Sequence, residues 1–167
     1  PQELQSYRDE GLGVFVSLVE ADTGKEIDSA ALKSGASYRA KVRLSSGRDR
    51  TFVALRVPVP SGAEILDTAF VTTGTAKNGE TKNTGNDYDY DYDYDYDYYP
   101  RGRLSNQVIM DNEVQYFWDY LNKGEVEVSF LFRTARRGVY PTPPAQAECM
   151  YEPEIFGRAR GILYTIE

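Results

Sequence analysis

The feature that most constrains the fold is a strict two-residue alternation in the second half of the chain. The segment that ends at Arg133 reads VEVSFLFR, with Val126, Val128, Phe130 and Phe132 at every second position. Successive side chains of a strand point to opposite faces, so this pattern places four apolar side chains on one face. We therefore predict a central strand of a β-sheet here, with that face against the core.

The rest of the chain repeats this pattern in short segments separated by turn residues, and no segment has the three-to-four-residue spacing of an amphipathic helix. The expected strands are Val14 to Glu20, Tyr38 to Leu44, Thr51 to Val59, Ile65 to Val71, Asn106 to Met110, Val114 to Leu121, and Arg158 to Glu167. About seven strands with these spacings predict an all-β fold, a two-layer antiparallel β-sandwich of Ig-like architecture. Residues 1–10 are polar and are expected to be a linker into the domain.

Two connections in the second half of the chain have recognisable turn chemistry. Residues 122–124 read NKG, which predicts a three-residue hairpin that pairs Val114 to Leu121 antiparallel with the central strand. After the central strand, Pro141, Pro143 and Pro144 mark an edge or a loop, because proline cannot donate to a sheet ladder. Trp118, the single tryptophan, lies on the apolar face of its strand and is expected in the core.

A further short strand is expected to end at Met150 and Tyr151. These two residues follow Cys149, and Pro153 comes two residues later. Proline removes a donor and restricts the residue before it, so Met150 and Tyr151 are expected at the end of a strand.

Composition excludes several kinds of chemistry. The chain has no histidine, so it holds neither an imidazole base for a serine or cysteine triad nor the usual zinc sites. Cys149 is the single cysteine, which leaves no internal disulfide and no histidine beside the thiol to activate it. We expect it to be a small buried apolar residue, and we expect no catalytic residue, metal site or cofactor.

A low-complexity segment separates the two halves of the chain. Residues 72–86 are rich in Gly, Thr, Asn and Lys, and residues 87–100 read DYDYDYDYDYDYYP. The favoured interpretation is a simple repeat that has expanded in a tolerant surface loop, so residues 72–103 are predicted to be a long disordered or extended insertion. The alternative is that the six aspartates bind calcium, but the glycine-turned spacing of known calcium loops is absent.

Those six aspartates also account for most of the charge. The formal net charge is −7, and the aspartates of the repeat carry six of these negative charges, which leaves −1 for the rest. A nearly neutral body beside an acidic tract does not favour nucleic acid as a partner, since phosphate binding needs a basic face.

Several motifs together resemble one family. The chain contains, in order, RVPVPSGAEI, DNEVQYFWDYLNKGEVEVSFLFR, FRTARRGVY, PTPPAQAE, the pair Met150-Tyr151, and a closing GRARGILYTIE. This order of motifs is similar to the C-terminal macroglobulin-like domain of bacterial alpha-2-macroglobulins, and it covers most of the chain apart from residues 72–103. The resemblance implies one macroglobulin-like β-sandwich over residues 1–167.

The resemblance also implies a role. Family members are envelope proteins, periplasmic or surface-exposed and in some cases membrane-anchored, that act as peptidase inhibitors by trapping an attacking peptidase. In them the last domain packs against the thioester domain through a Met-Tyr region, which here corresponds to Met150 and Tyr151 as a thioester-shielding interface. The alternative for these two residues is ordinary core packing at a strand end. The partners implied are the thioester domain, the other macroglobulin-like domains of the parent chain and, through the parent, target peptidases.

The reactive thioester itself is not in this chain. In the family it joins a cysteine to a glutamine three residues later, whereas Cys149 is followed at that distance by Glu152. Because the chain begins at Pro1, we expect it to be a piece of a longer protein whose targeting signals lie elsewhere. The second hypothesis is a β-sandwich module for adhesion or spacing in a bacterial surface protein, since one fold serves many functions.

Overall fold

The computed structural model describes residues 4–66 and 104–167, in which fourteen β-strands and no helix are found. The predicted all-β class is confirmed. No membrane-spanning helix occurs among the described residues. The predicted insertion, residues 72–103 with its Asp-Tyr repeat, lies outside them.

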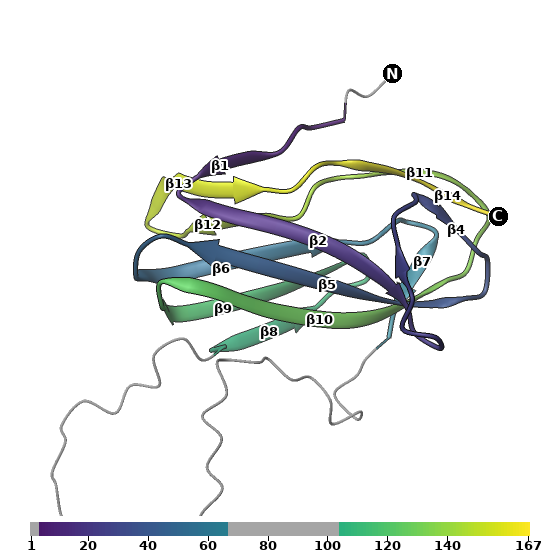
Figure 1. The fold of residues 1–167 in the computed structure, drawn as a ribbon, viewed down its shortest axis with the longest axis horizontal. Coiled ribbons are helices and arrows are strands. Elements are labelled where there is room, and N and C mark those ends of the chain that lie inside the picture. Colours follow the sequence, from purple (N-terminus) through teal and green to yellow (C-terminus); the bar gives the residue numbers. More distant parts are fainter. Residues whose placement is uncertain (1–3, 67–103) are drawn as a thin grey trace, which may run out of the picture.

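The two main layers are sheets of six and five strands that face each other, with β2, β5 and β10 in front of β12, β6 and β9 in Figure 1. The first sheet consists, in spatial order, of β1 (Arg8–Glu10), β13 (Glu152–Arg158), β12 (Gln146–Cys149), β6 (Arg50–Pro58), β9 (Glu113–Leu121) and β8 (Asn106–Ile109). The second consists of β3 (Glu26–Ile27), β2 (Leu12–Glu20), β5 (Ser37–Ser46), β10 (Gly124–Thr134) and β7 (Ala63–Ile65). All pairs within these two sheets are antiparallel, as the alternation predicted.

A small third sheet departs from the purely antiparallel expectation. It consists of β11 (Gly138–Thr142), β14 (Ile162–Ile166) and β4 (Ala31–Leu32), in that order. β14 pairs antiparallel with β11 and parallel with β4. Pro141 lies in the edge strand β11, which agrees with the edge position predicted for it.

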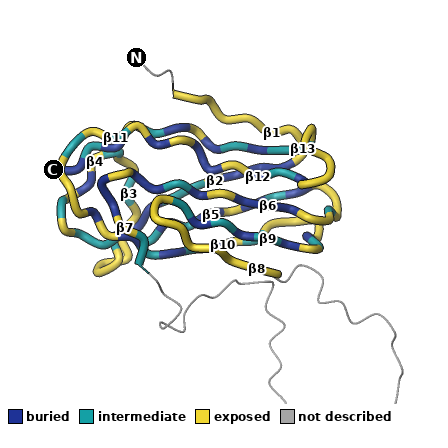
Figure 2. The backbone as a smooth tube through the Cα atoms, turned by 180° about the vertical axis from the view of Figure 1, so that it is seen from behind, coloured by how far each residue is buried: buried dark blue, intermediate teal, exposed yellow. Residues whose placement is uncertain are grey.

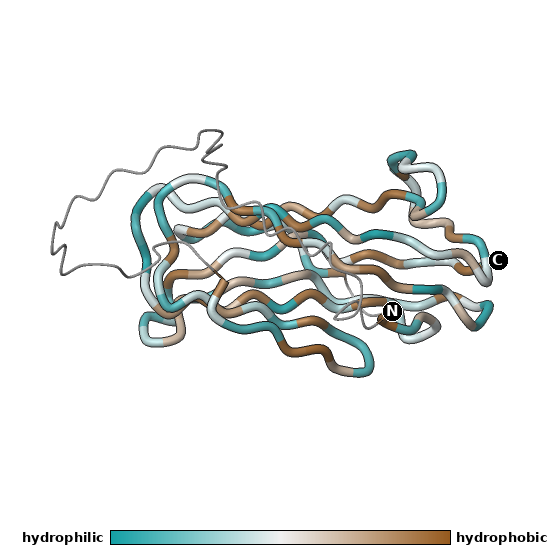
Figure 3. Tube along the Cα trace, turned by 90° about the horizontal axis from the view of Figure 1, so that it is seen from below, coloured by the Kyte–Doolittle hydropathy of each residue, from teal (hydrophilic) through white to brown (hydrophobic). Residues whose placement is uncertain are grey.

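The core lies between the two large sheets and follows the alternation of their strands. In β10, Val128, Phe130 and Phe132 are buried, and Trp118 is buried in β9 as predicted. Burial of one such large apolar side chain contributes about 1.5–3 kcal/mol relative to its exposure. Figure 2 shows buried and exposed positions alternating along the strands, and Figure 3 shows hydrophilic residues gathered in the turns at the ends.

The predicted hairpin between β9 and β10 is wrong. β8 does pair antiparallel with β9, but β9 pairs with β6 in one sheet while β10 pairs with β5 in the other. Residues 122–123 therefore form an arch that crosses between the layers, and the β5–β6 connection does the same. A short polar segment with glycine serves an arch as well as a hairpin, so the turn residues alone could not separate them.

The N-terminal segment differs from the expectation. Residues 8–10, predicted as linker, form strand β1, which pairs with β13.

The segment around Pro153 is extended, because β13 runs from Glu152 to Arg158 and includes this proline. The register shifts between Glu148 and Cys149, where Glu148 pairs with Phe156 and Cys149 with Glu152. Pro153 lies in that irregular stretch, where a ladder donor is not needed.

Candidate functional site

The candidate site is the turn between β12 and β13, at the end of the sandwich opposite the C-terminus (Figure 1). Cys149 pairs with Glu152, so the two residues between them, Met150 and Tyr151, form the turn. The pair was predicted at the end of a strand, and it lies in the turn just beyond that end, since β12 stops at Cys149. The sequence folds in this way because Ala147 and Cys149 point into the core and fix β12 between β6 and β13.

Both turn residues are exposed despite being large and apolar in character. The exposed fraction is 49% for Met150 and 77% for Tyr151. A single exposed apolar residue is ordinary, but adjacent ones at the tip of a rigid hairpin make an apolar surface that a partner can cover.

A third residue, Phe52 near the start of β6, belongs to the same surface. Its ring lies edge-to-face with that of Tyr151, with centroids 5.1 Å apart and an interplanar angle of 88°. The backbone N–H of Met150 donates to the Phe52 carbonyl oxygen over 2.8 Å. Phe52 is 44% exposed. We call Phe52, Met150 and Tyr151 together the apolar tip.

Sequence reasoning missed Phe52 because it was assigned only to the alternating segment Thr51 to Val59. The signal was present: Val53, Leu55 and Val57 fill the core-facing positions, so Phe52 is an aromatic residue on the opposite parity. Alternation shows which face a residue occupies, but it does not show whether that face is covered by another part of the protein.

Cys149 lies beneath the apolar tip and is unsuited to nucleophilic chemistry. It is 2% exposed, which confirms the buried position predicted for it. Burial raises the pKa of its thiol, Glu152 and Glu154 raise it further, and Arg50 opposes them. A thiol is nucleophilic only as thiolate, so this environment disfavours the reactive form. Within residues 4–66 and 104–167, no group of three or more Cys, Asp or Glu residues is placed to hold a metal ion.

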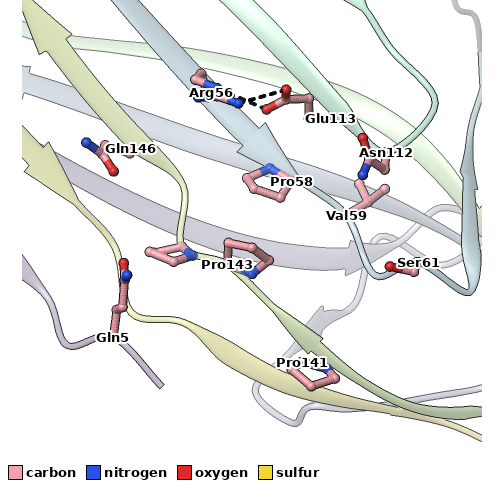
Figure 4. A pocket seen from close by; sticks show the side chains of 11 residues that line it. Gln5, Arg56, Pro58, Val59, Ser61, Asn112, Glu113, Pro141, Pro143 and Gln146 are labelled. Carbon is pink, nitrogen blue, oxygen red and sulfur yellow. Dashed lines mark hydrogen bonds and ion pairs between the residues drawn. The ribbon is translucent and has the colours of Figure 1, made fainter. Parts of the chain in front are cut away.

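A second feature is a cavity of about 530 Å³ beside the proline-rich segment (Figure 4). Pro58, Pro141 and Pro143 form part of its wall, and Gln5 and Gln146 lie on another side. Arg56 donates to both carboxylate oxygens of Glu113 across the cavity rim, over 3.1 Å from Nε and 3.0 Å from Nη2. Both oxygens of that carboxylate are thus engaged, and the other lining groups do not define one ligand chemistry.

Comparison with known families gives a match over most of the chain. The family model for the bacterial alpha-2-macroglobulin MG10 domain matches residues 11–154. This range includes the apolar tip and ends before β14. No curated protein sequence matches the chain.

Solved structures of similar fold include alpha-2-macroglobulins from two bacteria. Salmonella alpha-2-macroglobulin reacted with methylamine has a TM-score of 0.73 and 15% identity, covering 99% of this chain and 10% of that one. Trypsin-activated alpha-2-macroglobulin from Escherichia coli has a TM-score of 0.73 and 14% identity, covering 100% and 11% respectively. A native E. coli structure spanning domain MG7 to the C-terminus has a TM-score of 0.73 and 15% identity, covering 100% and 25%.

These structural likenesses, at such low identity, show the fold. In each of them this chain corresponds to a small part of a longer protein, from 10% to 25% of its length.

Proposed function

The chain belongs to the bacterial alpha-2-macroglobulin family, as a macroglobulin-like MG10 domain, and from this we propose that it is a non-catalytic lid over the thioester of its parent protein. In this proposal, residues 1–167 form one domain that carries the insertion 72–103. Met150 and Tyr151 pack against the thioester domain of the same parent chain and keep water and stray nucleophiles away from the reactive bond.

The observation that carries the proposal is the exposure of Met150 and Tyr151 on a hairpin held by the core. Docking of this turn on another domain would remove its apolar surface from water, at a gain of about 25 cal/mol per Å² of apolar area. The side chains are also chemically suitable as a cover. A thioether and a phenol ring are polarisable and largely apolar, and neither is a strong nucleophile at neutral pH. Exclusion of water from a reactive group is a recognised way to prevent its loss by hydrolysis.

The proposal places the thioester in another domain of the parent. Glu152 stands at the position where a glutamine would be required after Cys149, so this chain cannot form the bond. The Salmonella relative is described as reacted with methylamine, and E. coli relatives as activated by trypsin and by porcine elastase. In this proposal the parent inhibits peptidases in the bacterial cell envelope, in the periplasm or at the surface, and a part of it other than this chain supplies any membrane anchor. The activation of relatives by peptidases favours this role over the adhesion or spacer module.

The experiment replaces both turn residues in the parent protein, as Met150→Ala with Tyr151→Ala. The expected result is a thioester that reacts faster with methylamine. The melting temperature of this chain should stay the same, because the two truncated side chains are exposed. The matched control replaces Val139 in β11 and Leu163 in β14 by alanine. These residues are 59% and 45% exposed, and their strands lie towards the C-terminal end of the sandwich in Figure 1. That control should leave the methylamine rate unchanged.

Two outcomes would contradict the proposal. An unchanged methylamine rate in the turn variant would show that the turn does not shield the thioester. A loss of roughly 4 kcal/mol in the unfolding free energy of this chain would assign the two residues to its core, since truncation of buried large side chains costs about that much.

A further inference from the structure

Phe52 has a backbone conformation that its side chain disfavours. Its φ is 52°, in the left-handed region, and it is the one non-glycine residue with positive φ among those that the structure describes. This region is adopted readily by glycine and, less so, by asparagine or aspartate, whereas a bulky residue in it is strained. A residue that keeps such a conformation is held there by its surroundings.

The strain is not compensated by burial of the ring in the core. Phe52 is 44% exposed, while its neighbour Val53 is fully buried and Ala54, on the same parity as Phe52, is 7% exposed. Phe52 lies on the outward face of β6, away from the core. The ring is therefore presented to solvent, next to the turn of the β12–β13 hairpin.

The contacts of Phe52 with this turn involve both its backbone and its side chain. The carbonyl oxygen accepts the N–H of Met150, which fixes the first residue of the turn. The ring meets Tyr151 edge-to-face, which restricts the orientation of the second. Edge-to-face pairs of this kind add about 0.5–1.5 kcal/mol beyond the area they bury.

We propose that Phe52 is a positioning residue that orients Tyr151 for docking on the thioester domain and supplies the third apolar side chain of the apolar tip. This inference rests on the proposed function. A preorganised surface loses less side-chain entropy when it docks, so an anchored Tyr151 shields better than a free one. Strain that an asparagine or a glycine would relieve is retained because neither could supply the ring.

The first experiment separates the backbone role of Phe52 from the role of its ring. Phe52→Gly keeps the carbonyl acceptor and adopts a positive φ without strain, but it removes the ring. In this chain we expect an unchanged or higher melting temperature, together with loss of the ring-current shifts of the Tyr151 ring protons measured by NMR. A large fall in melting temperature would show that the Phe52 side chain is part of the core packing. Unchanged chemical shifts of Tyr151 would show that Phe52 does not orient the Tyr151 ring. Either result would overturn the inference.

The second experiment measures shielding in the parent protein. Phe52→Gly should raise the methylamine rate of the thioester by about 2- to 10-fold, the factor that corresponds to one aromatic pair. The second variant, Phe52→Trp, has an aromatic ring at this position, so its methylamine rate should be closer to that of the unaltered parent than the rate of Phe52→Gly is. The matched control is Phe15→Ala, because Phe15 is 42% exposed and stacks on Tyr7 with ring centroids 5.6 Å apart. This control should leave the rate unchanged.

The outcomes distinguish the inference from the function on which it rests. If the Met150 and Tyr151 double variant raises the rate but Phe52→Gly does not, the role of Phe52 is overturned and the shielding function stands. If neither variant raises the rate, both fall. An increase with Phe52→Gly that Phe52→Trp does not reverse would also overturn the inference, because the ring would then not be the cause.

Discussion

Tyr116 in β9 combines deep burial with an unsatisfied hydroxyl group. The residue is 2% exposed, and its hydroxyl oxygen meets no hydrogen-bond partner among the described residues. A buried polar atom without a partner costs about 1–3 kcal/mol. We therefore expect Tyr116→Phe to leave the free energy of unfolding at pH 7 unchanged or to raise it by about 1 kcal/mol, measured by urea denaturation. Tyr140→Phe is the contrasting control, because the Tyr140 hydroxyl donates to backbone carbonyls and its removal should be destabilising.

The same burial predicts how stability depends on alkaline pH. Burial raises the pKa of Tyr164 to about 12 and also raises the pKa of Tyr116, both from an ordinary value of 10.0. The unfolded chain therefore releases these protons at lower pH than the folded one, so stability is fully present below about pH 10 and falls as the pH rises towards 12. Tyr116→Phe should make this fall less steep. An equal slope in the variant would show that Tyr116 does not contribute to it.

Individual residues were predictable where alternation alone decides their position. Trp118 and Cys149 were assigned to the interior from parity and from the absence of an activating partner, and both are buried. Phe52 was not found, because its role depends on its left-handed backbone conformation and on the β12–β13 turn beside it. A local pattern of apolar residues contains neither of these.

At the scale of the elements, the arches between the two sheets are tied together by one side chain. Asp49, in the β5–β6 arch, accepts a hydrogen bond from the Tyr120 hydroxyl over 2.9 Å and from the Lys123 backbone N–H over 2.8 Å. Hydrogen bonds to a charged group contribute more than neutral ones, although exposure weakens these.

We expect Asp49→Ala to lower the free energy of unfolding by about 1–2 kcal/mol in chemical denaturation, since both arches lose a common acceptor. Asp22→Ala, in the exposed β2–β3 turn, is the matched control and should change stability by less than about 0.5 kcal/mol. Equal effects of the two substitutions would show that Asp49 does not link the arches.

Strand positions were predicted better than strand pairing. The alternation gave β2, β5, β6, β9 and β10 within a few residues of their observed bounds. It did not give the sheet to which each belongs, because a strand of a sandwich has the same apolar face in either layer. The small strands that build the third sheet were also mostly missed, since two residues such as those of β4 carry no period at all.

At the scale of the whole molecule, the two sheets come into close contact at Gly157. A side chain at this position in β13 would overlap the backbone carbonyl of Leu12 in β2. There the chain passes from the first sheet, through β1, into the second, and Gly11 at φ 106° makes the change of direction. The absence of a side chain at Gly157 thus allows this edge of the sandwich to close.

We expect Gly157→Ala to destabilise the chain by about 1–3 kcal/mol, the usual cost of overpacking a rigid interior. The matched control is Gly47→Ala, because a methyl group there meets nothing within 4 Å. Thermal unfolding of the two variants checks the prediction. A Gly157→Ala variant as stable as the control would mean that β1 and β2 can move away from β13 without cost.

The pairing of β5 with β10 has a consequence for the time at which this protein acquires its structure. Ser37–Ser46 pairs with residues 124–133, and Arg50–Pro58 pairs with β9, so β5 and β6 each have a main pairing partner in the second half of the chain. On a ribosome that adds about 5–20 residues per second, the apolar strands β5 and β6 wait several seconds for those partners. During this interval their edges and apolar faces are open to other chains, so a nascent molecule is at greatest risk of aggregation before β9 and β10 emerge.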